Sequence, residues 1–251
     1  MESPDRFAAY YEALEARHLA ELTFAEVRRA LQALSSLYVE RRGRMAEGAA
    51  LDGAGKRAAF ALYYGPSHFL LVREVVRALG LRAPRRIVDL GCGTGTSGAA
   101  WALEGAPAAR VEGIDRSGWA VAEARWTFAR LGLGGRATRG DAATAPLPPG
   151  EDGVLAAFTV NELSEEPRRR LLARLVAAAA SGSTVLVVEP ISRRVTPWWP
   201  EWVRAFVGAG GREDEWRFRP PLPDRLALLG KAAGLDSREL SGRSLLLPPG
   251  L

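Results

Sequence analysis

Hydrophobic residues in the first eighty positions recur at intervals of three and four, the period of an amphipathic helix. Phe7, Tyr11, Leu14 and His18 follow this spacing, so they predict one face of a first helix. The same rule applied along the segment predicts helices over residues 7–18, 24–38, 56–64 and 67–79. Residues 1–80 are therefore expected to form a helical N-terminal cap.

Short polar signals mark where these helices begin and end. Thr23 followed by Glu26 is a capping box, which predicts the start of the second helix. Gly65-Pro66 predicts the end of the third helix, and Gly80 predicts the end of the fourth.

After residue 85 short apolar runs alternate with helical stripes. Strands are predicted over residues 86–90, 110–114, 136–139, 153–160 and 184–188. The stretch 192–223, rich in Trp and Pro, is expected to be irregular, and residues 235–240 and 243–247 are expected to form a terminal antiparallel hairpin. Repeated β-α units predict an α/β fold, a doubly wound Rossmann-like sheet of about seven strands. Residues 81–251 are assigned to this one domain.

Composition limits the possible partners and compartments. The 251 residues carry a net charge of +5, almost all of the basic residues being Arg, and the pI is about 9.8. This charge favours an anionic partner such as RNA, although a coding bias towards Ala, Arg, Gly and Pro explains it equally well. A single cysteine, Cys92, excludes intrachain disulfides and cysteine-rich metal sites, and no metal site is predicted. Without signal-peptide character or a membrane-length apolar run, a soluble cytoplasmic protein is expected.

A glycine turn follows the first predicted strand. Residues 93–98 satisfy the G-x-G-x-x-G pattern, and Asp115 lies where a ribose-binding acid would lie. Taken alone, this turn fits a dinucleotide. Asp89, however, ends a buried strand just before the turn, where a carboxylate costs several kcal/mol unless it is paired. It suits a cofactor that carries an amine or a sulfonium.

Polar residues also follow the third and fourth strands. Asp141, in Gly140-Asp141-Ala142, is placed to accept a hydrogen bond from an adenine amino group. Residues 159–163, Thr-Val-Asn-Glu-Leu, point polar groups at the same edge of the sheet.

With these four ordered elements, residues 85–190 resemble the class I S-adenosylmethionine-dependent methyltransferases. The resemblance implies an enzyme whose cofactor is S-adenosylmethionine, with Asp89 near its methionine end, Asp115 at the ribose and Asp141 at the adenine. Glycines of the turn would contact the cofactor through bare backbone. The implied cofactor-binding residues are Asp89, Gly91, Cys92, Gly93, Gly95, Asp115, Arg116, Asp141, Ala142 and Thr159.

Three residues are candidates for acting on the methyl acceptor. Asn161 could orient an acceptor amine or hydroxyl and Glu162 could take its proton, or both could simply cap the turn into the next helix. His68, in the helical lead, is the candidate imidazole base. Cys92 lies in the cofactor turn, so it is interpreted as a small packed residue rather than a nucleophile.

A narrower resemblance concerns the acceptor. Residues 152–163 and 184–190 are similar to a methyltransferase-like family linked to small-ribosomal-subunit assembly, which implies RNA or a ribosomal subunit as partner. That family often carries clustered cysteines after the fifth strand, and this chain has none there. A small-molecule methyltransferase and a non-catalytic RNA-binding assembly factor are the alternatives.

The tryptophan-rich stretch has two interpretations. Its aromatic rings and interleaved arginines could stack exposed bases and contact phosphates. Alternatively, the tryptophans pack a long cap over the sheet edge, as large aromatics do in cores. The residues concerned are Trp198, Trp199, Trp202, Trp216, Arg193, Arg194, Arg204, Arg212, Arg217 and Arg219.

Overall fold

The computed structural model describes residues 6–40, 51–105, 109–148, 150–235 and 238–250. Two compact units are present. The first comprises Met1–His68 with Arg219–Leu240, and the second comprises Phe69–Phe218 with Ser241–Leu251. Residues 219–240 thus cluster with the N-terminal helices, whereas the sequence placed them in the same domain as the sheet.

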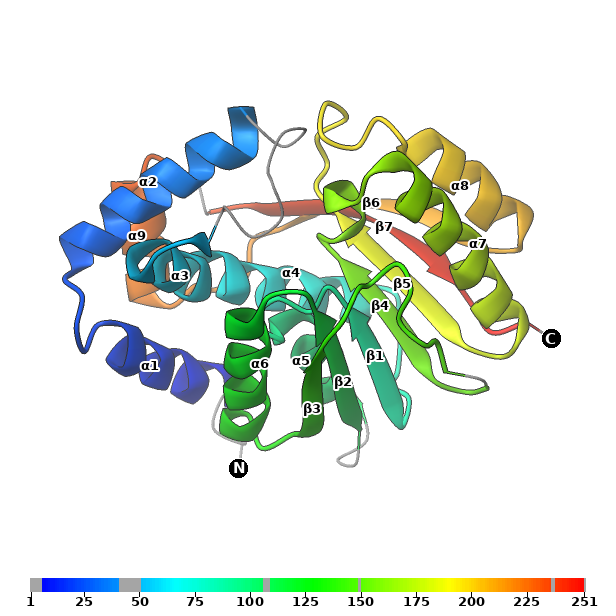
Figure 1. The fold of residues 1–251 in the computed structure, drawn as a ribbon, viewed down its shortest axis with the longest axis horizontal. Helices are drawn as coiled ribbons and strands as arrows, with labels where there is room; N and C mark the ends of the chain where they lie inside the picture. The colour runs from blue at the N-terminus through cyan, green and yellow to red at the C-terminus, as the bar shows by residue number, and fades with distance from the viewer. Residues whose placement is uncertain (1–5, 41–50, 106–108, 149, 236–237, 251) are drawn as a thin grey trace. The chain divides into compact units, whose positions relative to one another are not determined.

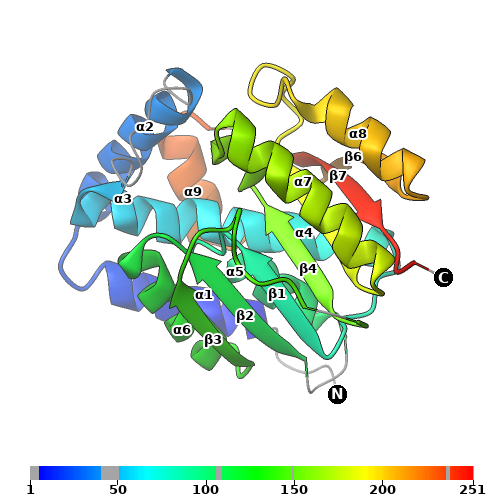
Figure 2. The ribbon, with the colours of Figure 1, turned by 45° about the vertical axis from the view of Figure 1, so that its right-hand side comes forward.

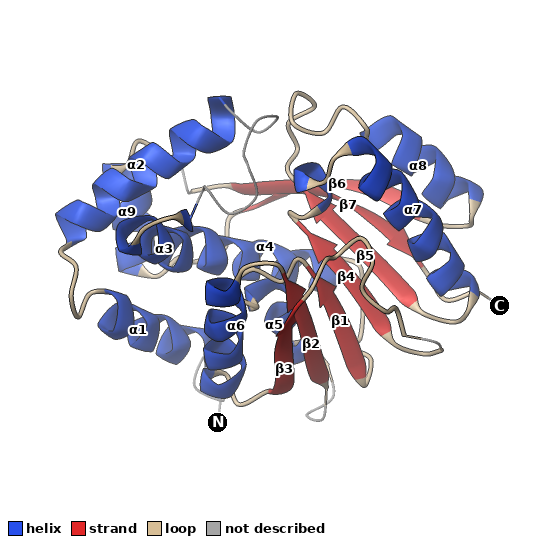
Figure 3. Cartoon of the chain, in the orientation of Figure 1, coloured by secondary structure: helices blue, strands red, loops and turns tan. Residues whose placement is uncertain are grey.

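The second unit is built on one seven-stranded sheet of order β3-β2-β1-β4-β5-β7-β6 (Figures 1 and 3). β1 pairs in parallel with both β2 and β4, so the chain reverses its direction of winding at β1. Ligands of such sheets bind outside the carboxyl ends of the strands at that point. The predicted Rossmann-like fold is confirmed. The strands are β1 (Arg86–Leu90), β2 (Arg110–Asp115), β3 (Gly134–Arg139), β4 (Gly153–Ala157), β5 (Thr184–Glu189), β6 (Arg212–Phe218) and β7 (Leu240–Leu247).

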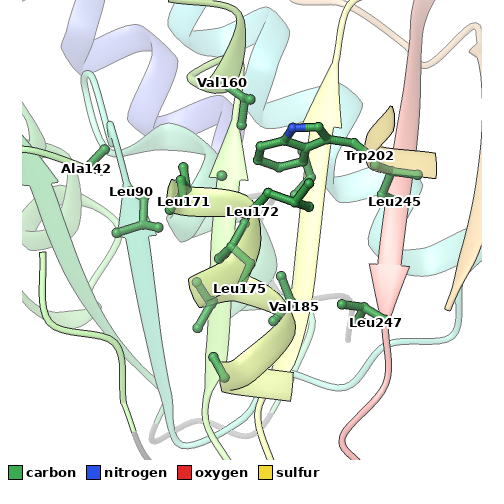
Figure 4. Packing of buried hydrophobic residues seen from close by; sticks show 14 of the residues in the cluster. Leu90, Ala142, Val160, Leu171, Leu172, Leu175, Val185, Trp202, Leu245 and Leu247 are labelled. Atoms are coloured by element: carbon green, nitrogen blue, oxygen red, sulfur yellow. The ribbon is translucent and has the colours of Figure 1, made fainter. Parts of the chain in front are cut away.

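Helices α7 (Glu165–Ala180) and α8 (Trp199–Gly208) lie side by side over the β4–β5–β7 part of the sheet (Figure 2). Leucines of α7, Trp202 of α8 and the inward residues of β5 and β7 form one continuous apolar cluster (Figure 4). Two further helices, α5 (Thr96–Leu103) and α6 (Gly118–Arg130), pack on the β1–β2–β3 part. Because strand residues alternate between faces, Val88 and Leu90 join the α7 cluster while Asp89 faces α5.

Two predictions for the C-terminal third are wrong. The stretch 192–223 is not irregular, since it contains α8 and the strand β6. β6 is an edge strand in which charged residues dominate and only every second residue is half-buried. Its sequence therefore lacks the apolar run by which the other strands were predicted.

The predicted terminal hairpin is also absent, because β7 runs as one strand through Gly242 and pairs with β5 in an antiparallel ladder. A Cβ at Gly242 would lie 3.0 Å from Leu71 and 3.2 Å from the carbonyl oxygen of Glu189. This glycine therefore marks a close approach within a strand, and not a turn.

The first unit contains α1 (Arg6–His18), α2 (Phe24–Glu40), α3 (Ala54–Ala59), a π-helical turn η2 (Phe60–Tyr64) and α9 (Asp224–Ala232). The capping box at the start of α2 is confirmed. The Thr23 amide donates to Glu26 Oε2 at 2.8 Å, and the Glu26 amide donates to Thr23 Oγ1 at 3.3 Å.

Gly65-Pro66 does not end a helix, contrary to prediction. The chain passes from α3 through η2 directly into α4 (Gly65–Ala78). The Gly65 amide reaches back to the Phe60 carbonyl, five residues earlier, as the π-helix requires. Pro66 has no N–H, so the Leu62 carbonyl lacks its α-helical donor. The Tyr11 hydroxyl donates to that carbonyl instead, at 3.3 Å in a buried setting.

Over the ranges that the structure describes, no helix is both long and apolar enough to cross a membrane.

Tyr11→Phe is expected to lower the free energy of unfolding by about 1–2 kcal/mol, because it removes a buried hydrogen bond to the Leu62 carbonyl. Urea denaturation measures this change. Pro66→Ala provides the control, since it restores an N–H four residues after Leu62. In the Pro66→Ala background Tyr11→Phe should cost clearly less, and an equal cost in both backgrounds would contradict the assignment.

Candidate cofactor and acceptor site

The turn between β1 and α5 is shaped by glycines in the left-handed region. Gly91, Gly93 and Gly95 have φ values of 66°, 51° and 77°, which residues with a Cβ rarely adopt. A Cβ at Gly91 would lie 2.4 Å from the Thr159 side chain, and one at Gly95 would lie 2.7 Å from Phe128. The bare backbone of this turn therefore packs closely against the end of β4 and against α6.

Asp89 is fully buried at the end of β1, and its Oδ2 accepts a hydrogen bond of 3.0 Å from the Gly98 amide. Burial raises the pKa of Asp89 to about 7, although the Gly98 hydrogen bond opposes the shift. Gly98 has to be glycine here, because a Cβ would lie 2.7 Å from that oxygen. A cation placed beside Asp89 would favour its ionised form.

Asp115, the last residue of β2, ties the glycine turn to the start of α6. Its Oδ2 accepts from the Gly93 amide at 2.9 Å, and its Oδ1 accepts from the Ser117 amide at 2.8 Å. Carboxylate oxygens have further lone pairs, so these two bonds leave capacity for ribose hydroxyls.

Arg116 and Asp141 form an ion pair of 2.7 Å that joins the ends of β2 and β3. Partial burial acts to raise the pKa of Asp141. The hydrogen bonds from Arg116 and from the Ala143 amide, together with the Arg116 charge, outweigh it and lower that pKa. Arg116 therefore contributes to the site by holding Asp141. Ala142, next in the chain, is buried.

Cys92 is buried against the neighbouring strand, where a Cβ at Gly113 would lie 2.7 Å from its sulfur. Burial raises the pKa of the Cys92 thiol well above its usual value. The thiol is thus protonated at neutral pH, as suits the interpretation of Cys92 as a small packed residue.

Thr159 fixes the end of β4 to the end of β1. Its hydroxyl lies within hydrogen-bonding distance of the carbonyl oxygens of Leu90 (2.9 Å), Ala157 (3.1 Å) and Gly91 (3.2 Å). The residue before it, Phe158, has a φ of 58°, which costs a side chain with a Cβ of the order of 1–3 kcal/mol. Such strain is concentrated at functional sites, and sequence reasoning missed Phe158 because its conformation leaves no signal in the sequence.

Asn161 is turned towards a buried acid that the sequence did not select as a site residue. Glu189, the last residue of β5, accepts from the Asn161 side-chain amide at 2.5 Å and from the Val160 amide at 2.8 Å. Burial raises the pKa of Glu189 to about 8, and the hydrogen bonds from Asn161 and Val160 oppose the shift. The sequence did carry a signal for Glu189, because an acid that follows an apolar strand was also the signal by which Asp89 was selected.

Asn161 and Glu162 lie in a single 3-10 turn, η3 (Val160–Glu162). In this structure Asn161 therefore caps the turn through Glu189, as one of the two predicted interpretations requires. Glu162 is exposed to solvent. Its role as a proton acceptor stays a prediction.

His68 belongs to the first compact unit, where its ring lies 6.2 Å from Tyr64 and 6.4 Å from Phe60, measured between centroids. Its predicted role as a base stays a prediction.

The tryptophan-rich stretch contributes to the core. Trp198, Trp199 and Trp202 are 7%, 2% and 1% exposed, so their faces are not available to stack on bases. Two of its arginines pair with acids on the same strand, Arg212 with Asp214 and Arg217 with Glu215. The packing interpretation is therefore correct for these three tryptophans.

The arrangement around β1 fits a nucleoside cofactor that carries a positive charge. Glycines leave backbone open to close approach, and acids stand at the ends of β1, β2 and β3. Thr94, within the turn, has a buried hydroxyl without a hydrogen-bond partner, a group that a ligand would satisfy. Among the described residues, His, Cys, Asp and Glu side chains nowhere gather in threes that could hold a metal ion.

Comparisons with known proteins agree with this geometry. Residues 87–182 match a family described as "Methyltransferase domain". No curated protein matches the chain significantly.

Among solved structures, the plantazolicin methyltransferase BpumL, in complex with a monoazolic desmethylPZN analog and S-adenosylhomocysteine, has a TM-score of 0.52 at 13% identity, over 90% of this chain and 97% of its own. An S-adenosylmethionine-dependent methyltransferase from Geobacter sulfurreducens in complex with S-adenosyl-L-homocysteine has 0.45 at 18% identity, over 70% and 90%. A putative RNA methyltransferase from Pyrococcus horikoshii has 0.49 at 13% identity, over 74% and 86%.

The predicted enzyme class, an S-adenosylmethionine-dependent methyltransferase, and its cofactor are confirmed. The contacts of individual residues with the cofactor stay predictions.

The two buried acids make stability depend on pH. Between about pH 4 and the raised pKa values of Asp89 and Glu189, the folded chain holds protons that the unfolded chain has lost. The free energy of unfolding of the ligand-free protein should therefore fall as pH rises through this window, by at most about 1.4 kcal/mol per pH unit for each group. Urea denaturation at several pH values measures the slope.

Asp89→Asn and Glu189→Gln should each flatten this slope, and Glu151→Gln, at an exposed acid, should leave it unchanged. Identical slopes in all four proteins would show that neither buried acid is responsible.

Asp115→Ala should weaken binding of S-adenosylhomocysteine about 30-fold, which corresponds to about 2 kcal/mol for lost charge-assisted hydrogen bonds. Isothermal titration calorimetry measures the affinity. Asp152→Ala is the matched control, because it removes the acid paired with Arg86 at the amino ends of β1 and β4, at the other end of the strands from the glycine turn. Wild-type affinity in Asp115→Ala would rule out a ribose contact.

Proposed function

We propose that this S-adenosylmethionine-dependent methyltransferase acts on a nitrogen or oxygen atom of a small organic acceptor, which binds at the carboxyl ends of β4 and β5. The observation that carries the proposal is the burial of Trp198, Trp199 and Trp202. These rings are part of the core, so the stacking surface that RNA recognition would require is not formed by them.

When bound, S-adenosylmethionine supplies an electrophilic methyl group on a sulfonium that leaves as a neutral thioether. In this proposal Asp89 stabilises the positive charge of such a ligand, and Asp115 and Asp141 accept hydrogen bonds from its ribose and adenine. The left-handed glycines allow the backbone to approach it closely. These residues contribute mainly by positioning, which is sufficient for much of the acceleration of a group transfer.

On the acceptor side, Asn161 and Glu162 have the chemistry to orient a nucleophile and to receive its proton. The half-buried Asn161 and the exposed Glu162 follow each other in η3, directly after the strained Phe158 and Thr159. Strain at Phe158 supports a functional role for this corner.

The likeness to the plantazolicin methyltransferase is one observation in favour of a small acceptor. The likeness covers 90% of this chain, and the compound named in that complex besides S-adenosylhomocysteine is a monoazolic desmethylPZN analog.

RNA or a ribosomal subunit is the second candidate acceptor, favoured by the net charge of +5. The resemblance of residues 152–163 and 184–190 to the ribosome-assembly family supports the same candidate and stays a prediction. Ion pairing of Arg212 and Arg217 with acids weakens the contribution that β6 would make to phosphate binding.

Transfer of a labelled methyl group distinguishes these candidates. The enzyme is incubated with labelled S-adenosylmethionine and, separately, with the small-metabolite fraction, total RNA and total protein of the source cells. We expect label in the metabolite fraction, little affected by salt. Label in RNA that falls steeply with rising salt would establish the second candidate. Absence of label from every fraction, with S-adenosylhomocysteine still bound, would contradict catalysis.

A further inference from the structure

The ladder between β5 and β7 ends in a charged pair. Val185 lies opposite Leu247, Val187 opposite Leu245, and Glu189 opposite Arg243. Cross-strand partners lie on the same face of the sheet, here the face covered by α7 and α8. Two apolar pairs of the core are thus followed, at the carboxyl end of β5, by an acid and a base.

Arg243 is buried without being satisfied. Its side chain is 7% exposed, and its guanidinium carbon lies 4.2 Å from the centre of the Trp199 ring. Neither Nε nor Nη2 has a hydrogen-bond partner. Burial lowers the pKa of Arg243, while the charges of Glu213 and Glu189 act in the opposite direction.

Both neighbouring carboxylates are engaged by other donors. Glu213, on β6, accepts from the Trp199 indole N–H at 2.6 Å. Glu189 accepts from Asn161 and Val160 of the η3 turn. A buried guanidinium with unpaired N–H groups costs free energy, and native proteins retain few such groups without a reason. The contacts of this state therefore do not explain why the Arg243 N–H groups are buried without acceptors.

Asn161 presents the complementary problem. Its amide donor is bound to Glu189 Oε2 at 2.5 Å, so in this state it is not available to a methyl acceptor. If the amide turned to an acceptor, Glu189 Oε2 would lose its donor in a buried position, and a buried polar atom left unpaired costs free energy.

We propose that Arg243 is a positioning residue that takes over Glu189 Oε2 when the Asn161 amide turns to the acceptor. The exchange satisfies the unpaired Arg243 donors and the released carboxylate oxygen together. It rests on the proposed function in one respect, the contact of Asn161 with the acceptor. The stack on Trp199 holds the guanidinium beside Glu189 before the exchange.

A double-mutant cycle on the ligand-free protein tests the exchange without an acceptor. Asn161→Ala removes the donor to Glu189 Oε2, and Arg243→Met removes its proposed replacement while keeping an apolar side chain against Trp199. Asn161→Ala should lower the thermal midpoint by at least about 3 °C more in the Arg243→Met background than in the wild type. Additive shifts would overturn the proposal.

Arg86→Met is the matched control, because it breaks an arginine–carboxylate pair at the amino ends of β1 and β4, whereas Arg243 and Glu189 lie at the carboxyl end of β5. Its effect should add to that of Asn161→Ala, since the two sites share no partner. Coupling of the same size in this control would also overturn the proposal. If Arg243→Met does not fold, the NMR signal of the Arg243 Nε–H is followed in Asn161→Ala alone. There it must move downfield and exchange more slowly, and an unmoved signal counts against the exchange.

With the cell fraction that accepts label, Arg243→Met should lower kcat about tenfold and leave KM for S-adenosylmethionine unchanged. Arg243→Lys should restore part of the rate, because it returns a donor to Glu189. A rise in KM with kcat preserved would contradict a role through Asn161. Failure of methyl transfer altogether would refute the proposed function, whereas the thermal cycle decides the exchange independently.

Discussion

Burial of carboxylates at the carboxyl edge of the sheet is the constraint on which this structure depends. Asp89 is the second-last residue of β1 and Glu189 is the last residue of β5, each follows a run of buried apolar residues, and the two acids lie on different faces of the sheet. Neither has a hydrogen-bonded arginine or lysine partner among the described residues, so backbone and side-chain amides supply their stabilisation. The protonation state of a buried carboxyl group depends on the charges and hydrogen-bond donors that bind beside it. The architecture therefore places two responsive acids at the edge where ligands enter.

These acids also explain the local chain geometry. Gly98 is required because the Asp89 oxygen occupies the place of a side chain, and the η3 turn is held because Glu189 accepts from its amides. Thr159 binds the ends of β1 and β4 together between them. The strain at Phe158 is compatible with folding because its own amide donates to the Val188 carbonyl at 2.8 Å and the next residue, Thr159, is bonded to the end of β1. The buried acids and the strained Phe158 therefore lower the stability of the fold, and they fix the positions of the polar groups at the carboxyl ends of the strands.

Much of this was accessible from the sequence, since it depends on local pattern. Apolar runs, capping residues and the spacing from Asp89 to Asp115 predicted the sheet, the start of α2 and the carboxylates around the glycine turn. Features decided by distant neighbours were not accessible. At Pro66 the helix continues through a π-helical turn, and Tyr11, from another helix, donates to the Leu62 carbonyl. Gly242 was interpreted as a turn residue. The close approach of Leu71, which explains the glycine, comes from a distant part of the sequence and could not be predicted. Glu189 carried the same sequence signal as Asp89, an acid after an apolar run, but its partners in η3 are 28 and 29 positions away in the sequence, so its role was not predicted.

The order of the strands has a consequence for how the chain is made. β7 lies between β5 and β6 in the sheet, although it follows both of them in the chain. During translation β5 therefore keeps an open edge, and β6 has no neighbour in the sheet, until Leu240–Leu247 has left the ribosome. Open edges of apolar strands invite pairing with other chains. The nascent protein is therefore exposed to aggregation until β7 has been made, and a chaperone that shields β5 would act in that interval.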